Sequence, residues 1–344
     1  MIDRALAERL ALLLTGGAGD ASTPPSWLGA RAERAAERIV EVTGLTPAGA
    51  LPSPEWLHRG EWAAANLTST SSLLNPLLDR VGDNLGVLAG PARAGVSYVA
   101  SAEIGALLGF VGRRVLGQYE LTLLDPSAPA RLLFVGPNID AAAVGMDVKR
   151  DDLADWVIFH EVTHAVQFAG VPWLREHIAG LLRELLGELE LKVDTSALSR
   201  MPTADDLKAL AASVRDGGLL AAVGPEKREL IDRVQAIMAL VEGHAEWTMD
   251  AAAEDVIPSL DTLRAALDAR RRERSPALRL LDRLLGLELK LRQYREGRAF
   301  CDAVVAAAGV PAMHGAWRSP QDAPTTEELR DPTLWLTRQG LRAA

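Results

Sequence analysis

The chain has 344 residues, of which 48% are hydrophobic and 24% are charged, so it is long enough to bury a sizeable core. Its 46 acidic residues outnumber its 37 basic ones, and the formal net charge of −9 argues against a nucleic-acid partner. The single cysteine, Cys301, excludes an internal disulfide and is expected to be a buried core thiol.

The N-terminal segment contains a short apolar run, Leu10 to Leu14, directly after Glu8 and Arg9. A secretory signal needs an uncharged apolar stretch of about 7–15 residues, and a membrane span needs about 20. This run is too short for either. We therefore expect an amphipathic N-terminal helix in a cytoplasmic protein without membrane insertion.

Most of the chain has leucine, alanine and valine at spacings of three and four residues, which is the pattern of helices. Between Gly117 and Ile139, two apolar runs flank a turn-forming segment, which predicts an antiparallel β-hairpin. We expect a mainly α (α+β) fold, with one domain over 1–344, and allow for a helical subdomain near 173–225. Helices are predicted near 2–15, 26–43, 54–81, 102–116, 151–169, 173–190, 203–214, 226–252, 259–273 and 276–308.

The strongest chemical signal is the pentad His160-Glu161-x-x-His164 within the helix predicted for 151–169. Because the two histidines are four residues apart, both imidazoles project from one helix face and can bind one tetrahedral Zn²⁺. Glu161 is turned by about 100° from His160 and can reach a metal-bound water without being a ligand. This is the H-E-x-x-H pattern of zinc peptidases, in which the glutamate is the general base.

A catalytic zinc with two histidine ligands needs a third protein ligand. In the helical segment 231–250, Glu242 falls within the apolar face, where a carboxylate needs a cation or a hydrogen-bonded partner. Glu242 is the predicted third ligand, and the alternative is a buried ion pair with an arginine. Glu246, one turn later, is predicted to orient a ligating histidine or to replace Glu242 as the ligand. His244 lies outside the apolar face and is expected at the surface or rim.

Several residues are weaker candidates for contact with a substrate. Peptide substrates often pair with a strand edge, so the strand Leu132 to Val135 and the side chain of Asn138 can line the site. Tyr294 or His314 can donate a hydrogen bond to the oxyanion of a tetrahedral intermediate. The alternative for each of these residues is a purely structural role.

Several segments together resemble a known family. They are EWAAAN (Glu61 to Asn66), VLGQYEL (Val115 to Leu121), LLFVGPNI (Leu132 to Ile139), HEVTHAVQFAGVPWLREH (His160 to His177), VEGHAEWTMD (Val241 to Asp250), LLGLELKLRQYREGRAF (Leu284 to Phe300) and PTTEELRDPTLWLTR (Pro324 to Arg338). Over nearly its whole length, the chain resembles a bacterial zincin-like family that is grouped with hydrolases and associated with deazaflavin-cofactor biosynthesis. No glycine-rich phosphate loop or dinucleotide fingerprint supports the cofactor association.

This resemblance implies one mostly helical zincin-type domain, with His160 and His164 as metal ligands and Glu161 as the catalytic glutamate. It also implies that Glu242 is the first carboxylate of a glutamate-zincin ligand helix. The orienting acid four residues later is often aspartate in such helices, whereas this chain has Glu246.

The expected function is that of a zinc-dependent hydrolase, a metallopeptidase in which Glu161 acts as general base toward a zinc-activated water. The expected substrate is a peptide or a small amide. One alternative is a catalytically silent zincin-fold scaffold whose structural metal has a fourth protein ligand, such as His244 or Glu246. Another is a hydrolase of non-peptide amides. The presence of Glu161 argues against the scaffold, because a structural metal site has no use for that carboxylate.

Overall fold

The computed structural model describes residues 2–16, 23–84, 89–123, 125, 127–187, 225–272 and 287–341. The helix predicted near 203–214, and most of the subdomain considered near 173–225, lie outside the described residues. The fold is mainly α with a small sheet, which confirms the predicted fold class. By its internal contacts the chain divides into two compact units, and the single-domain organisation stays a prediction. The first unit comprises Met1–Glu37, Ala50–Ala165 and Asp255–Ala266; the second comprises Arg38–Gly49, Val166–Glu254 and Leu267–Ala344.

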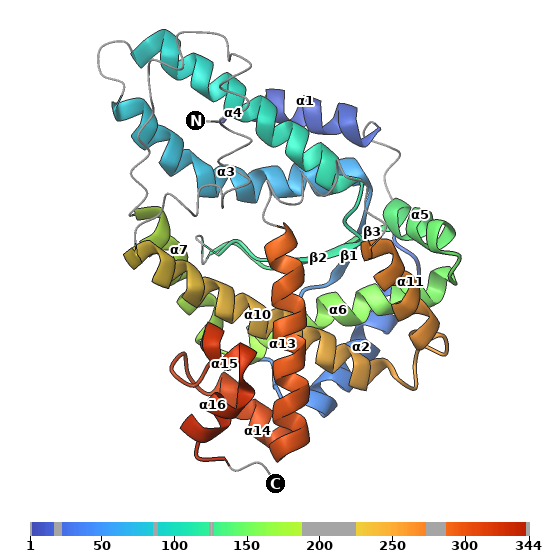
Figure 1. The fold of residues 1–344 in the computed structure, drawn as a ribbon. Helices are drawn as coiled ribbons and strands as arrows, with labels where there is room; N and C mark the ends of the chain where they lie inside the picture. Colours follow the sequence, from blue (N-terminus) through green and yellow to red (C-terminus); the bar gives the residue numbers. More distant parts are fainter. Residues whose placement is uncertain are drawn as a thin grey trace. The chain divides into compact units, whose positions relative to one another are not determined.

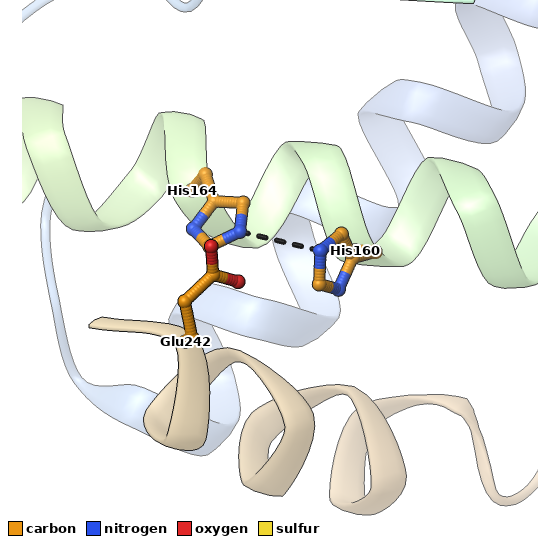
Figure 2. A group of neighbouring side chains, drawn as sticks. All are labelled: His160, His164 and Glu242. Carbon is orange, nitrogen blue, oxygen red and sulfur yellow. Dashed lines mark hydrogen bonds between the residues drawn. The ribbon is translucent and has the colours of Figure 1, made fainter. Parts of the chain in front are cut away.

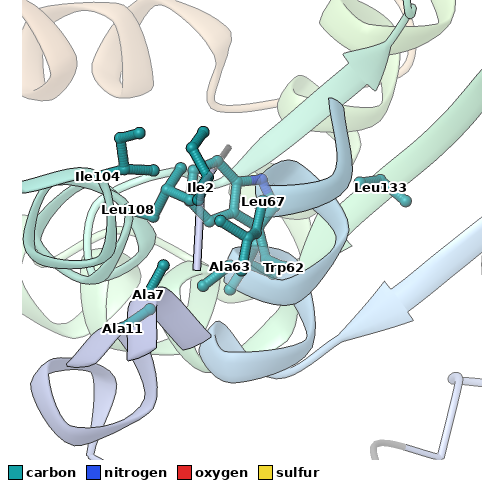
Figure 3. Packing of buried hydrophobic residues seen from close by; sticks show 10 residues of the cluster. Ile2, Ala7, Ala11, Trp62, Ala63, Leu67, Ile104, Leu108 and Leu133 are labelled. Atoms are coloured by element: carbon teal, nitrogen blue, oxygen red, sulfur yellow. The ribbon is translucent and has the colours of Figure 1, made fainter. Parts of the chain in front are cut away.

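Three helices of the first unit pack against one another: α1 (Arg4–Thr15), α3 (Arg59–Asn84) and α4 (Ala89–Gly112) (Figure 1). Their shared core is apolar and includes two residues of the sheet (Figure 3). Its buried members are Ile2, Ala7, Ala11, Trp62, Ala63, Leu67, Ile104, Leu108, Leu133 and Val135. Burial of such side chains is the main driving force for folding, so this cluster holds the N-terminal helix and the sheet in one unit.

The sheet has three strands in the order β1-β3-β2, with bounds β1 (Pro54–Leu57), β2 (Gly117–Glu120) and β3 (Arg131–Val135). The antiparallel pairing of β2 with β3 confirms the predicted hairpin. Strand β1, parallel to β3, was not predicted: the helix expected from residue 54 begins only at Arg59. The reason is that β1 is stabilised by a partner far along the chain, which local periodicity does not reveal.

This strand order also corrects an expectation about substrate binding. Strand β3 is central, with β1 on one side and β2 on the other, and Leu132 to Val135 are all buried. A strand can take up an extended peptide only along an open edge. The prediction that Leu132 to Val135 offers such an edge is therefore wrong. Strand β2 is an edge strand, and it contacts Glu161 of the pentad.

Helix α5 (Gly136–Met146) follows β3 directly and was not predicted; Pro137 lies in its first turn, where its missing N–H costs nothing. Helix α6 (Arg150–Gly170) is one uninterrupted helix and carries the pentad. Asp151 and Asp152 lie in its first turn, where carboxylates interact favourably with the helix dipole. The carboxylate of Asp152 also accepts a hydrogen bond from the Ser259 hydroxyl.

In the second unit, the long helices α10 (Pro225–Ala253) and α13 (Leu287–Ala308) pack against each other (Figure 1). They meet at two glycines. A Cβ added to Gly297 would lie 1.8 Å from the carbonyl oxygen of Ala239, and one added to Gly243 would lie 2.0 Å from the carbonyl carbon of Gly297. The two backbones therefore touch directly beside Glu242.

The remaining helices in the described part of the chain are shorter than α10 and α13. They are α2 (Leu28–Thr43), α7 (Leu174–Gly187), α11 (Leu260–Arg272), α14 (Val310–His314), the 3-10 turn η3 (Gly315–Trp317), α15 (Thr326–Arg330) and α16 (Pro332–Arg338). Helix α15 begins with a capping box between Thr325 and Glu328. No helix in the described part of the chain combines the length and apolar character that a membrane span requires.

Cys301 is 0% exposed within α13, which confirms the expected core thiol. Burial, with a smaller contribution from the neighbouring Asp302, raises the pKa of the thiol far above its usual range. Because only the thiolate is nucleophilic, we expect no reaction with a disulfide reagent such as DTNB in the native state. Denaturation should release one reactive thiol per chain. Rapid labelling of the native protein would contradict this placement.

Candidate metal centre

His160 and His164 lie one turn apart on α6, and their rings face each other edge to face (Figure 2). The two Nε2 atoms are 3.3 Å apart, and the ring planes are inclined at 86°. Trp156, one turn before His160, stacks on its imidazole with an angle of 7° between the planes. The helix spacing and this stacking together hold both imidazoles on one side of α6.

Glu242 comes from α10, and its carboxylate points toward the two histidines (Figure 2). One possible ligand atom from each of the three residues lies within 4.8 Å of the others. Glu242 is only 5% exposed and His164 only 8% exposed. A buried carboxylate beside two imidazoles is a costly arrangement unless a cation or hydrogen bonds stabilise it.

The three side chains fit a zinc ion by their chemistry and by their spacing. Two imidazole nitrogens and one carboxylate oxygen form the His₂Glu donor set known from catalytic zinc sites. Zinc–nitrogen bonds of about 2.0–2.1 Å at a tetrahedral angle separate two nitrogen ligands by about 3.3 Å. The Nε2 atoms of His160 and His164 are 3.3 Å apart, so this pair needs little movement to bind one ion.

Glu161 is buried beside the histidines, with 7% exposure. The backbone N–H of Tyr119 in β2 donates to its Oε2 at 2.7 Å. Gly117 makes this approach possible, since a Cβ at that position would lie 2.8 Å from Glu161 Cγ and 2.7 Å from Val157 Cγ1. Strand β2 therefore lies against α6 at the predicted general base and fixes the direction of its carboxylate.

His244 and Gln167 form a buried polar contact next to this cluster. His244 is 0% exposed, so the expected surface or rim position is wrong. Its Nδ1 lies 2.9 Å from Gln167 Nε2, and its ring packs edge to face on Trp317. A helical wheel considers one helix alone, whereas these partners come from other parts of the chain. Gln167 was not predicted as a site residue, although it lies on the histidine face of α6, two turns after His160.

Glu246 is not part of the three-residue cluster found among the described residues. It is half-buried, and its backbone carbonyl accepts a hydrogen bond from Arg298 at 3.2 Å.

Asn138 is buried in α5, where Nδ2 donates to the carbonyls of Gly112 and Val115 while Oδ1 accepts from Arg59. These hydrogen bonds give Asn138 a structural role. Contact between Asn138 and a substrate stays a prediction.

The two oxyanion candidates also stay predictions. Tyr294 lies in α13, but its side chain is outside the described part of the structure. The His314 ring lies against Gly44, whose added Cβ would be 3.0 Å from His314 Cε1. Burial lowers the pKa of His314. His314 is not part of the cluster of possible metal ligands found among the described residues.

The mainly helical fold and the His₂Glu cluster on α6 and α10 define a protein of the zincin class. A family model described as zincin-like metallopeptidase matches residues 2–336, and the chain belongs to this family. The chain is also similar to the crystal structure of "a putative hydrolase with a novel fold" from Chloroflexus aurantiacus. The TM-score is 0.72 and the identity 29%, over 99% of each chain. No match was found among curated proteins. The family and this similarity together support a hydrolase.

Proposed function

We propose that this protein is a zinc-dependent hydrolase that cleaves peptide bonds, with His160, His164 and Glu242 as metal ligands and Glu161 as general base. The observation that carries the proposal is that one possible ligand atom from each of these three side chains lies within 4.8 Å of the others, with His164 and Glu242 buried and His160 half-buried. The pentad alone supplies two of these ligands. The third ligand, Glu242, comes from a separate helix. Burying its carboxylate there costs free energy unless a cation or hydrogen bonds stabilise the charge.

Each residue then has a distinct task. When bound, zinc polarises the scissile carbonyl and acidifies a water molecule. Glu161 accepts a proton from the attacking water at its carboxylate and delivers it to the leaving amine. The N–H of Tyr119 holds one carboxylate oxygen of Glu161, so the base keeps its direction during the reaction. Burial of this carboxylate strengthens its electrostatic interactions, because the local dielectric is low.

The arrangement favours an open catalytic site over a closed structural one. A structural zinc has four protein ligands, whereas a catalytic zinc has three and keeps one position for water or substrate. The cluster contains three ligands among the described residues. His244, considered above as a fourth ligand, instead directs Nδ1 toward Gln167. A non-peptide amide would require the same chemistry, and the peptide is preferred because the family is one of metallopeptidases.

Metal content provides the direct test. Elemental analysis of the reconstituted wild type is expected to give about one zinc per chain. Glu242→Ala should lose most of this zinc because it removes a ligand. Glu246→Ala, the matched change one turn later, should retain zinc at saturation with an affinity weakened by at most about 10–100-fold. Absence of zinc from the reconstituted wild type, or equal zinc in both variants, would overturn the proposed ligand set.

A further inference from the structure

The side chain of Gln167 connects the helix that carries the histidines to the helix that carries Glu242. Its Nε2 donates to the backbone carbonyl of Val241 at 2.9 Å and lies 2.9 Å from His244 Nδ1. Gln167 and His244 are both 0% exposed. The contact is therefore a direct protein bridge from α6 to α10 in a position that water does not reach.

The chemistry of the partners fixes the orientation of this amide. A backbone carbonyl only accepts hydrogen bonds, so the NH₂ group of Gln167 must face Val241. Its second hydrogen then points toward His244 Nδ1, which must act as the acceptor. A neutral imidazole that accepts at Nδ1 carries its proton on Nε2. The bridge thus uses both N–H groups of Gln167 and selects one tautomer of His244.

The α10 end of the bridge is itself held in place. The His244 ring packs edge to face on Trp317, with 5.1 Å between the ring centroids. The carbonyl of Trp317 accepts a hydrogen bond from the indole N–H of Trp173 at 2.8 Å. The hydroxyl of Thr248 lies 3.4 Å from His244 Nδ1. These contacts restrain the His244 ring relative to α10. The hydrogen bond from Gln167 to His244 therefore restrains the position of α10 itself.

The position of the bridge along the two helices gives it influence over the metal ligands. Gln167 lies one turn after His164, and Val241 directly precedes Glu242. The bond therefore joins the backbone from which the Glu242 side chain departs to the helix face that presents both imidazoles. A shift of α10 along α6 would break this bond and displace the carboxylate at the same time.

We propose that Gln167 is a positioning residue that sets the place of Glu242 opposite His160 and His164. This inference rests on the proposed metal site and adds a residue that acts on metal through another side chain. Such supporting contacts typically change metal affinity by about 10–100-fold.

The test compares Gln167→Met with Thr163→Val. Methionine keeps the length of glutamine and removes both N–H donors. Thr163 is another fully buried polar residue of α6, but its hydroxyl bonds to the Phe159 carbonyl within the same helix. The zinc Kd is measured by chelator competition, and the visible absorption of the Co²⁺-substituted protein reports the coordination geometry. For Gln167→Met we expect a Kd raised by about 10–100-fold and an altered Co²⁺ spectrum. Thr163→Val should match the wild type in both readouts.

A double variant separates positioning from stability. Gln167→Met with His244→Phe replaces both partners by apolar groups, which restores stability more readily than removing one partner. The double variant still lacks the bond to the Val241 carbonyl, so its zinc Kd should remain raised. A wild-type Kd and Co²⁺ spectrum in Gln167→Met, or a wild-type Kd in the double variant, would overturn the positioning role of Gln167 and leave the proposed metal site standing. A wild type that takes up neither ion would overturn the metal site and this inference together.

Discussion

Replacing Glu161 with glutamine is expected to lower kcat/KM for peptide hydrolysis by about 10²–10⁴-fold, the usual contribution of a general base. Zinc content should remain that of the wild type, because Glu161 is not one of the three proposed ligands. The fold should also persist, since the amide oxygen of glutamine can still accept the hydrogen bond from the Tyr119 N–H. Cleavage of a quenched fluorescent peptide library, with zinc measured on the same samples, checks this result.

The control for this experiment is Glu176→Gln in α7. It makes the same chemical change at an exposed glutamate that pairs with Arg183 on the surface. We expect it to keep wild-type activity and zinc content. Equal hydrolysis by the Glu161 and Glu176 variants would show that the Glu161 carboxylate does not serve as the base.

Adding one methyl group at Gly297 is expected to cost about 3 kcal/mol or more, at the upper end of overpacking effects. The new Cβ would lie 1.8 Å from the Ala239 carbonyl oxygen, and this neighbour is backbone that cannot rotate away. Helices α10 and α13 would have to separate beside Glu242, so zinc affinity should fall as well. The expected decrease in Tm is about 4 °C or more. Thermal unfolding and zinc titration of Gly297→Ala measure both effects.

Gly180→Ala is the matched control for this substitution. Gly180 lies within α7, and a Cβ added there would meet no atom within 4 Å. Alanine favours a helix over glycine by roughly 0.5–1 kcal/mol, so stability should be unchanged or slightly higher. Similar losses in the two variants would show that helix flexibility, and not the contact between α10 and α13, determines the effect at Gly297.

The parts of the fold that follow from local pattern were predicted well from sequence. The helix with the pentad was expected over 151–169 and spans Arg150–Gly170, because apolar periodicity and a clear stop at Gly170 and Pro172 define it. The β2–β3 hairpin was expected because turn-forming residues separate two apolar runs. Glu242 was singled out by its place on an apolar face, and the structure brings it next to the histidines.

The parts that depend on distant partners were missed. Strand β1 exists only through its pairing with β3, and its four residues contain no alternating pattern long enough to identify. His244 was expected near the surface because it lies outside the apolar face of its own helix. Its burial requires Gln167 and Trp317, which only the folded chain brings to it. A polar side chain can be recognised as buried only when its hydrogen-bond partners are known.

The glycine in β2 also restricts how the sheet can assemble. Side chains on one face of a strand alternate with those on the other, so a one-residue slip against β3 would bring Gln118 toward α6 and a two-residue slip would bring Tyr119. Neither residue fits where a single Cβ would already lie 2.7 Å from Val157. In the observed register Gly117 lies opposite Phe134, and its missing side chain leaves room for α6. Gly117 therefore disfavours these two shifted registers on steric grounds. A chain in either register would not present the Tyr119 N–H to Glu161.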